Sequence, residues 1–442
     1  MNASPARTLW TVAVAALLSG ILYFVLFPNV FYPDTPSYVG PAEKLLAGEG
    51  FTGSDFAIAG TKVDSNGVPE TLRTPGYPLL LAFFLQMHLR LNGVIVFQHL
   101  LRVLIIVGTA AFVFKTSRSR KAALMTGILL VIDLPLLEAA NALLTEMLFT
   151  AVMVAVCWLL WNEAQTSDAP GLRLLGTGLL AGASVLVRPI TIFFFAPAFL
   201  FLLLTRPRLK VWAGMVFVFG FACLPTGWAV RNQRAMGRFT VTTISGFSAL
   251  QYKAAGSLAG ERPGKFQPNF EAAQKELEDR ACLEIERLYA RDCFQITPVE
   301  RSDYYSHLAR RVMWQHPYGF LRSWLHGAAV LMLDGGATTF KELLRTSGPT
   351  AMHFSMFYTV PVFLLSLWGL GRLWKINRSI FWLAICVLGY FILLSAGPEA
   401  DARFRVPMVP LYLLVAAQGL NSLVRRRRPL TTEPSASALG RV

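Results

Sequence analysis

The residues with the clearest chemical potential lie in the polar stretch after the first hydrophobic segment of the chain. Asp34 follows that segment by a few residues, and Tyr38, Arg73 and Tyr77 come later in the same stretch. A carboxylate can take a proton from a hydroxyl group, and the planar guanidinium group of arginine suits phosphate. This set therefore indicates a site for a sugar and a phosphate. The alternative for Asp34 is a solvated loop acid or a helix cap before Pro36.

A second carboxylate, Glu146, follows Asn141 and Thr145 at the beginning of a hydrophobic stretch. Carboxylates inside a membrane are costly and tend to be functional. With Asp34, this residue could hold a divalent cation through oxygen ligands or organise an acceptor. An interfacial acid held by its polar neighbours is the alternative, and two acids alone do not define a metal site.

Arginines also occur at the expected outer ends of hydrophobic stretches, close to prolines: Arg73, Arg188, Arg403 and Arg405. Positive charge on that side is opposite to the usual cytoplasmic bias of Lys and Arg. A phosphate at the bilayer surface is what a lipid-linked substrate presents, so we expect these residues to bind it. They could instead extend towards lipid headgroups, and Glu399 and Asp401 could pair with the last two.

Several catalytic motifs are absent from the chain. There is no glycine-rich loop followed by Lys-Ser or Lys-Thr, so the sequence does not indicate ATP binding. Neither His-Glu-x-x-His nor Gly-x-Ser-x-Gly occurs, and the six histidines are scattered.

The composition is that of a membrane protein. Of 442 residues, 54% are hydrophobic and only 15% are charged, whereas about 25% of a soluble domain is charged. The net charge of +15 could suggest nucleic acid, but the basic residues gather in short gaps at 115–121, 206–210, 372–378 and 425–428. Such gaps face the cytoplasm. We therefore expect a lipid bilayer as partner, and no nucleic acid.

The hydrophobic stretches predict an all-α polytopic membrane protein with about ten transmembrane helices. Each span approaches the roughly 20 residues that cross a bilayer. The expected spans are 9–27, 93–114, 122–138, 144–162, 173–188, 189–205, 211–229, 352–371, 379–396 and 406–424. Both termini are then cytoplasmic. The first span lacks a small-residue cleavage site, so we interpret it as a retained helix.

Two regions are expected outside the membrane: a first outer loop, 28–92, and a mostly helical extracytoplasmic segment, 230–351. In the loop, Gly76–His88 is short for a span and predicts a helix at the interface. The remaining parts are an N-terminal transmembrane catalytic module (1–229, which includes the loop), C-terminal helices (352–428) and a cytoplasmic tail (429–442). The tail is rich in Ser, Thr, Pro and Ala and is expected to be disordered.

Within 230–351 the pattern predicts three helices. Apolar residues recur at helical spacing from Phe270 to Leu288. Thr297-Pro298-Val299-Glu300 combines a cap, a proline and a capping acid at the start of the second helix. Pro317 begins a third, which Gly335-Gly336 ends. An oxidising compartment allows a disulfide between Cys282 and Cys293 without requiring it.

The order of these motifs resembles the glycosyltransferase-C (GT-C) superfamily, and within it the dolichyl-phosphate-mannose–protein mannosyltransferases and the aminoarabinose transferases. The likeness covers most of the chain. The matching pieces are Asp34-Thr35-Pro36-Ser37-Tyr38, Arg73-Thr74-Pro75-Gly76-Tyr77-Pro78, Leu144-Thr145-Glu146, Leu186-Val187-Arg188-Pro189, Arg231-Asn232 and Arg403-Phe404-Arg405-Val406-Pro407.

The resemblance implies roles for these residues. Asp34 corresponds to the catalytic acid of the first outer loop, Glu146 to the acid that supports it, and Arg73 to the residue that meets the lipid phosphate. The other expected substrate-binding residues are Tyr38, Tyr77, Arg188, Arg231, Arg403 and Arg405. The family often has a further acid beside the catalytic one, but Thr35 and Pro36 follow here. We therefore expect no obligatory cofactor, although the pattern leaves room for a divalent cation.

These observations predict an inverting glycosyltransferase. It would move a sugar from a polyprenyl-phosphate-linked donor to a hydroxyl of a glycan, lipid or protein acceptor, on the outer, periplasmic face of the cytoplasmic (inner) membrane. The alternative is a transporter or flippase of a lipid-linked sugar, which needs no general base. Transporters often have repeated halves with broken helices, whereas this chain has one acidic loop and one large outer segment.

Overall fold

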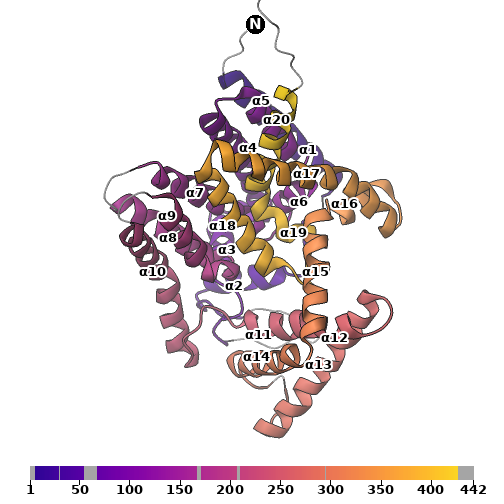
Figure 1. The fold of residues 1–442 in the computed structure, drawn as a ribbon. Coiled ribbons are helices and arrows are strands. Elements are labelled where there is room, and N and C mark those ends of the chain that lie inside the picture. The colour runs from indigo at the N-terminus through magenta and orange to yellow at the C-terminus, as the bar shows by residue number, and fades with distance from the viewer. Residues whose placement is uncertain are drawn as a thin grey trace, which may run out of the picture.

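The computed structural model describes residues 5–28, 30–53, 67–166, 171–206, 210–293 and 295–426. Over these ranges the chain forms helices and no β-strand, which confirms the all-α polytopic fold. The helices make two layers, a hydrophobic bundle and a smaller helical subdomain at one end of it (Figure 1). The expected disordered tail, 429–442, lies outside the described residues.

Among the described residues, seven helices are long and apolar enough to cross a membrane. They are α1 (Pro5–Leu26), α4 (Arg90–Ser117), α7 (Glu146–Ala164), α10 (Lys210–Met236), α17 (Gly348–Ile376), α18 (Arg378–Ser395) and the continuous stretch Ala402–Val424, which comprises α19 (Ala402–Arg405), η3 (Val406–Met408) and most of α20 (Val409–Arg426). The pair α5 (Arg120–Val131) and α6 (Leu134–Asn141), bent by 56°, brings the number to eight if it is one span.

Two of the ten expected spans, 173–188 and 189–205, are shorter than a bilayer requires. They correspond to α8 (Leu172–Val187, 16 residues) and α9 (Phe195–Thr205, 11 residues). Between them Arg188 is extended and Pro189–Phe193 forms the 3-10 turn η1. Proline restricts the residue before it to extended conformations, which ends α8 at this point. By length and composition, the described residues therefore hold seven or eight spanning helices, where about ten were expected.

Small residues let α8 pack directly on α10. A side chain at Gly178 would collide with the carbonyl oxygen of Phe217, and one at Gly182 with that of Phe221. Where two apolar helices meet within lipid, such close approach provides the van der Waals contact that holds them together. This packing fixes the end of α8, and with it the position of Arg188.

The break between α5 and α6 is stabilised by buried polar groups. Asp133 accepts a hydrogen bond from the backbone N–H of Leu136 (3.0 Å) and so caps α6. Arg102 of α4 donates to the carbonyl groups of Val131 (2.8 Å) and Ala16 (2.9 Å). A break within lipid leaves the carbonyl group of Val131, at the end of α5, without a helical partner. The guanidinium group of Arg102 donates a hydrogen bond to it.

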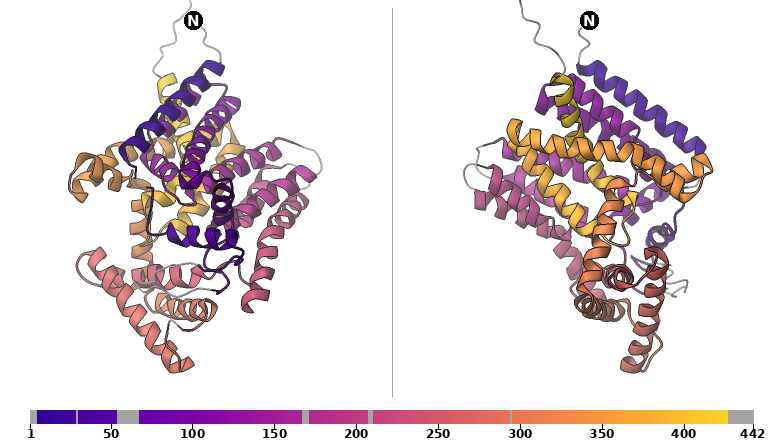
Figure 2. Two further views of the ribbon diagram at one scale, coloured as in Figure 1. Left: turned by 180° about the vertical axis from the view of Figure 1, so that it is seen from behind. Right: turned by 45° about the vertical axis from the view of Figure 1, so that its right-hand side comes forward.

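The helical subdomain consists of α11 (Ile244–Ser248), the π-helical turn η2 (Ala249–Ala254), α12 (Ala255–Glu261), α13 (Phe266–Tyr289) and α14 (Pro298–Gln315). Further views show it at the same end of the bundle (Figure 2). Helix α13 buries Phe270, Ala273, Leu277, Ala281 and Ile285, as the spacing predicted, but the last residue of that series, Leu288, is 68% exposed. The predicted capping box at Thr297 and Glu300 is present.

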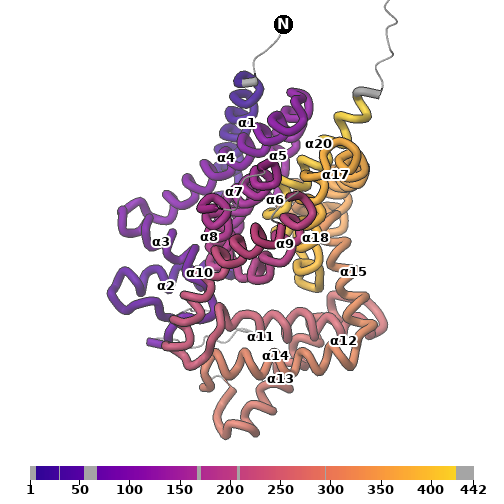
Figure 3. The backbone as a smooth tube through the Cα atoms, turned by 60° about the vertical axis from the view of Figure 1, so that its left-hand side comes forward, coloured from indigo at the N-terminus to yellow at the C-terminus, as the bar shows by residue number. Residues whose placement is uncertain are grey.

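The remaining helices join this subdomain to the bundle. Helix α15 (Pro317–Leu333) leads back to the bundle and confirms the third expected helix, and α16 (Ala337–Leu344) precedes α17. Near the subdomain lie α2 (Pro36–Leu46) and the end of α10, with α3 (Gly76–Gln86) beyond them (Figure 3). Residues 239–244, although rich in β-branched side chains, form no strand. They bond instead to the loop before α3, where Thr243 N–H donates to the carbonyl of Thr71 (2.9 Å).

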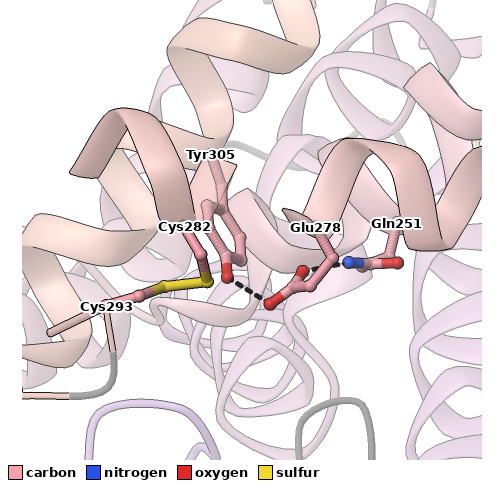
Figure 4. Close-up of a disulfide and its surroundings, with 5 residues drawn as sticks. All are labelled: Gln251, Glu278, Cys282, Cys293 and Tyr305. Carbon is pink, nitrogen blue, oxygen red and sulfur yellow. Dashed lines mark hydrogen bonds between the residues drawn. A yellow bond between two sulfur atoms is a disulfide. The ribbon is translucent and has the colours of Figure 1, made fainter. Parts of the chain in front are cut away.

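A disulfide joins Cys282 of α13 to Cys293, a pairing that the sequence left open (Figure 4). One turn before Cys282, the buried carboxylate of Glu278 accepts hydrogen bonds from Tyr305 Oη (2.7 Å) and from the side-chain amide of Gln251. A buried carboxylate is stable only when it is hydrogen-bonded. These bonds tie α13 and α14 to the π-helical turn.

Replacing both Cys282 and Cys293 by serine is expected to destabilise the helical subdomain. Closure of this short loop by a disulfide contributes about 2–4 kcal/mol. Hydrogen exchange of α13 and α14 should therefore become faster, while exchange in α4 and α7 stays the same. Cys223→Ser is the matched control, because Cys223 is exposed and lies outside the disulfide. Unchanged exchange in α13 would contradict a stabilising role.

Candidate functional site

A cavity of about 550 Å³ lies between the bundle and the helical subdomain. Its wall comprises the start of α2, the start of α7, the turn between α8 and α9, residues 240–248, η2 and the segment 394–404. Six of the nine predicted site residues line it: Asp34, Tyr38, Arg73, Glu146, Arg188 and Arg403. The fold thus brings together side chains that are up to 369 positions apart in the chain.

Asp34 lies just before α2 and pairs with Arg73. Oδ1 of Asp34 accepts a hydrogen bond from Arg73 Nη2 at 3.1 Å. The guanidinium group also donates to Ser37 Oγ (2.9 Å) and to Tyr38 Oη (3.1 Å), and it lies over the Tyr38 ring. Arg73 is therefore held in one orientation, with its charge directed at the Asp34 carboxylate.

Arg403 bridges the two predicted catalytic acids. Nη1 and Nη2 both lie 3.4 Å from Asp34 Oδ2, and Nε lies 3.3 Å from Glu146 Oε1. Asp401 caps the short helix α19 by accepting from the Arg403 N–H (2.9 Å), which fixes the start of that helix. Both oxygens of Asp34 therefore face arginine side chains.

Among the acids that line the cavity, Glu146 is the most deeply buried, with a side chain 3% exposed. It stands at the first position of α7, where the helix dipole favours a negative charge. Arg188 Nη1 lies 2.9 Å from Glu146 Oε1, and its guanidinium group packs between the rings of Phe149 and Phe404. In this apolar surrounding an unpaired charge would be costly, so the stability of each charged side chain depends on its ion-pair partner.

Three predicted site residues do not line the cavity. Tyr77 is fully buried in α3, donates to Gln98 Oε1 (2.9 Å) and packs edge-on against Tyr38. Arg231 donates to the carbonyl groups of Glu70 and Phe51 in the loop before α3. Arg405 is buried and donates to the carbonyl of Met332 (3.1 Å). These contacts hold the elements of the cavity wall in place. Direct contact of the three residues with a substrate stays a prediction.

The acids near Arg403 and Arg405 also pair differently from the alternative considered above. Glu399 does not contact either arginine; its Oε1 lies 2.6 Å from Lys253 Nζ of η2. Lys253 and its neighbour Tyr252 line the cavity. No pattern in the sequence indicated these two residues, because the turn that directs them into the cavity depends on packing of the helical subdomain.

The phenol group of Tyr252 is a donor in this wall. Burial raises the pKa of Tyr252, and the negative charges of Asp34 and Glu399 raise it further. The hydroxyl therefore keeps its proton at neutral pH. It adds to a set of hydroxyl groups in the same wall from Thr240, Thr242, Ser245, Ser248 and Ser395.

The charged side chains in the wall carry a surplus of positive charge. Four cations, Arg73, Arg188, Lys253 and Arg403, face three carboxylates, Asp34, Glu146 and Glu399. The lining also contains apolar side chains, among them Leu144, Val187, Ile190, Phe193 and Leu394. A ligand with one anionic group and an apolar part would match both features.

Within the described residues, no three His, Cys, Asp or Glu side chains lie close enough together to hold a metal ion. Asp34 and Glu146, which the sequence offered as a pair of oxygen ligands, have the guanidinium group of Arg403 between them.

Comparisons with known proteins add one distant likeness. No protein-family profile matches the sequence, and no curated protein matches it either. Among solved structures, the chain is similar to ArnT from Cupriavidus metallidurans, whose crystal structure is described as bound to undecaprenyl phosphate. The likeness covers 94% of this chain and 78% of ArnT at 13% identity, with a TM-score of 0.41. It is too distant to assign a function to any residue.

Removing the charge of Glu146 is expected to destabilise the protein. The variant Glu146→Gln keeps the shape of the side chain but leaves Arg188 and Arg403 without a common partner in an apolar wall, at a cost of about 3–5 kcal/mol. Thermal unfolding of the purified protein measures this loss. The control Asp303→Asn breaks a pair with Arg238 that is half exposed and should cost about 0–1 kcal/mol. Equal losses would show that burial does not matter at Glu146.

Proposed function

We propose that the protein is an inverting glycosyltransferase that uses a polyprenyl-phosphate-linked sugar as donor and a hydroxyl group as acceptor. The observation that carries this proposal is the position of Asp34. Its carboxylate faces a large cavity at the end of the membrane bundle and lies between two arginines, Arg73 and Arg403. One group suited to take a proton thus stands beside groups suited to bind a phosphate.

The reaction needs one base and one leaving-group site. The acceptor oxygen attacks the anomeric carbon from the side opposite the phosphate, and Asp34 takes the proton of the acceptor hydroxyl. The bond between the anomeric carbon and the phosphate oxygen breaks, and the electron pair leaves with the polyprenyl phosphate. Arginines placed where this negative charge develops stabilise the transition state. Arg73, Arg188 and Arg403 are suited to that role.

The rest of the cavity supports a lipid donor. Its surplus positive charge suits one phosphate, and the apolar lining beside η1 suits the beginning of a polyprenyl chain. The phosphate of such a lipid lies at the bilayer surface, and the cavity likewise lies where the bundle meets the helical subdomain. A soluble nucleotide donor would gain nothing from the apolar part.

We further propose that the helical subdomain is on the outer face of the cytoplasmic membrane, with both termini in the cytoplasm. The start of α1 and the end of α20 lie together at the end of the bundle farthest from the subdomain (Figure 1). The disulfide between Cys282 and Cys293 fits an oxidising compartment, and the basic gaps between hydrophobic stretches fit a cytoplasmic location. A glycan, lipid or protein acceptor would then reach the cavity from outside the cell membrane.

A transporter or flippase of the same lipid remains the competing function. It would also need arginines for the phosphate, but it would not need a carboxylate beside the reacting carbon. The cluster around Asp34 favours the enzyme, because Arg73 and Arg403 both donate to that carboxylate, and Ser37 Oγ accepts from Arg73 and so helps to orient it. Activity of a variant without the carboxylate distinguishes the two functions.

Asp34→Asn is expected to abolish sugar transfer and leave binding of the lipid intact. The amide cannot accept the proton of the acceptor, and loss of a general base lowers the rate about 10²–10⁴-fold. Mass spectrometry of membrane lipids from cells with the native protein, without it and with the variant measures this effect. The same glycosylated polyprenyl phosphate should accumulate in the null and in the Asp34→Asn cells.

Glu49→Gln provides the matched control, because Glu49 follows α2 and its side chain is 57% exposed. Cells with this variant should have the lipid profile of the native strain. If Asp34→Asn cells also keep the native profile while the null does not, Asp34 is not the base and transport becomes the better explanation.

Arg73→Lys is expected to weaken binding of undecaprenyl phosphate. Lysine keeps the charge, but it cannot reproduce the planar group that contacts Asp34, Ser37 and Tyr38 together. We expect the Kd to rise about tenfold, as for the loss of one charge-assisted hydrogen bond. The exposed Arg238→Lys serves as control. Equal affinity of Arg73→Lys and native protein would place the phosphate elsewhere.

A further inference from the structure

The wall of the cavity contains a second ion pair, Lys253 and Glu399, that the transfer step does not use. Lys253 Nζ lies 2.6 Å from Glu399 Oε1 and donates to the carbonyl of Ala396 at 2.8 Å. The two residues come from η2 and from the segment between α18 and α19. Their side chains are only 24% and 15% exposed, so the pair is a built part of the wall.

The backbone beside this pair leaves space for both side chains. Gly397 has φ +153°, a conformation that favours glycine, and a side-chain carbon there would lie 2.6 Å from Glu399 Oε2 and would also collide with Lys253 Nζ. Gly327 of α15 packs directly on the backbone of Gly397. The segment therefore cannot move away, and glycine at position 397 leaves room for both charged groups.

One oxygen of the pair has no protein partner. Within the described residues, Glu399 Oε2 is buried and accepts no hydrogen bond. A buried acceptor that stays unsatisfied is costly. Since Oε2 is closed to solvent, a ligand in the cavity can meet the pair only through its exposed parts, and Lys253 and Glu399 both line the cavity together with Tyr252.

We propose that Lys253, Glu399 and Tyr252 form the subsite for the sugar of the donor, and that this sugar is uncharged. This inference rests on the proposed function and specifies its substrate. A hydroxyl group of a sugar both donates and accepts hydrogen bonds, so adjacent hydroxyls match a carboxylate beside an ammonium group. The ring of Tyr252 offers an apolar surface and a hydroxyl donor next to them.

The location favours the sugar of the donor over the acceptor. Glu399 is four residues before Arg403 in one segment, and Arg403 contacts Asp34. Tyr252 lines the same cavity as Asp34, Glu399, Arg403 and Arg73. A sugar ring joined to a phosphate at Arg73 and Arg403 has to occupy this region, because the reacting carbon must lie beside Asp34.

The charge of the pair decides the class of sugar. Lys253 and Glu399 neutralise each other, so the subsite offers no net charge to its ligand. An amino sugar would require an unpaired carboxylate, and a uronate would require an unpaired cation, since an uncompensated charge in such a wall is costly. A neutral hexose or pentose can hydrogen-bond to both members of the pair without adding a charge.

Binding titrations with purified full-length protein in detergent test this inference. The probes are undecaprenyl phosphate and its esters with three neutral hexoses (glucose, mannose and galactose), with galacturonate and with 4-amino-4-deoxyarabinose. We expect the best neutral hexosyl lipid to bind about tenfold more tightly than undecaprenyl phosphate. The two lipids with charged sugars should bind no more tightly than undecaprenyl phosphate.

Two variants should shift the preference in opposite directions. Lys253→Met leaves Glu399 unpaired and should favour the amino sugar, whereas Glu399→Gln leaves Lys253 unpaired and should favour galacturonate. Gly397→Ala should remove the advantage of the neutral hexose without changing affinity for undecaprenyl phosphate. A misfolded protein would lose all ligands together, so these opposite shifts cannot come from misfolding.

Several results would overturn the subsite. The first is that native protein binds a lipid with a charged sugar more tightly than the neutral ones. The second is that no neutral hexosyl lipid binds more tightly than undecaprenyl phosphate. The third is that both charge variants keep the native order of affinities. Failure of undecaprenyl phosphate itself to bind would overturn the proposed function, and the subsite with it. Intact binding of undecaprenyl phosphate with no sugar preference would overturn the subsite alone.

Discussion

The architecture of the cavity depends on one interaction, the contact of Arg403 with both Asp34 and Glu146. The two carboxylates belong to segments that are more than a hundred residues apart, and the guanidinium group comes from near the end of the chain. Each charge alone would be costly in an apolar wall, but together they compensate one another. The same network recruits Arg73 and Arg188, so the loop before α2, the loop before α3, the start of α7 and the end of α8 converge on one place.

Much of this arrangement follows from the sequence, because charges beside hydrophobic stretches are rare and informative. Asp34, Glu146 and Arg188 stood out for that reason, and the structure places them together in the cavity wall. The helices of the subdomain were also predictable, since the apolar spacing of α13 and the capping box of α14 are local patterns. Local patterns say less about helix length: the spans 173–188 and 189–205 were expected to meet at Pro189, but the turn η1 takes up the start of the second, and α8 and α9 are only 16 and 11 residues long.

Other features depend on the direction in which a side chain points, and the sequence pattern does not specify that direction. Arg403 and Arg405 belong to the same motif, but two positions along a helix turn a side chain by about 200°. One therefore reaches the cavity, and the other is buried against the end of α15, where it supplies donors to backbone carbonyls. Likewise, Lys253 has no local mark of function. The π-helical turn sets the direction of its side chain, and its ion-pair partner, Glu399, is 146 positions away in the chain.

The helical subdomain can now be understood as more than a cover for the cavity. Tyr252 and Lys253 lie directly after Gln251, whose amide is held by Glu278, and Glu278 is in turn held by Tyr305 (Figure 4). The disulfide at Cys282 closes the adjoining turn of the same helix. A short π-helical turn has little stability of its own, so these long-range bonds determine where its side chains point. If the cavity binds a glycosylated lipid, the membrane bundle supplies the groups for its phosphate, and the subdomain supplies one side of the surface that meets its sugar. Selectivity for the sugar can then change through the subdomain while the charged network around Arg403 stays the same.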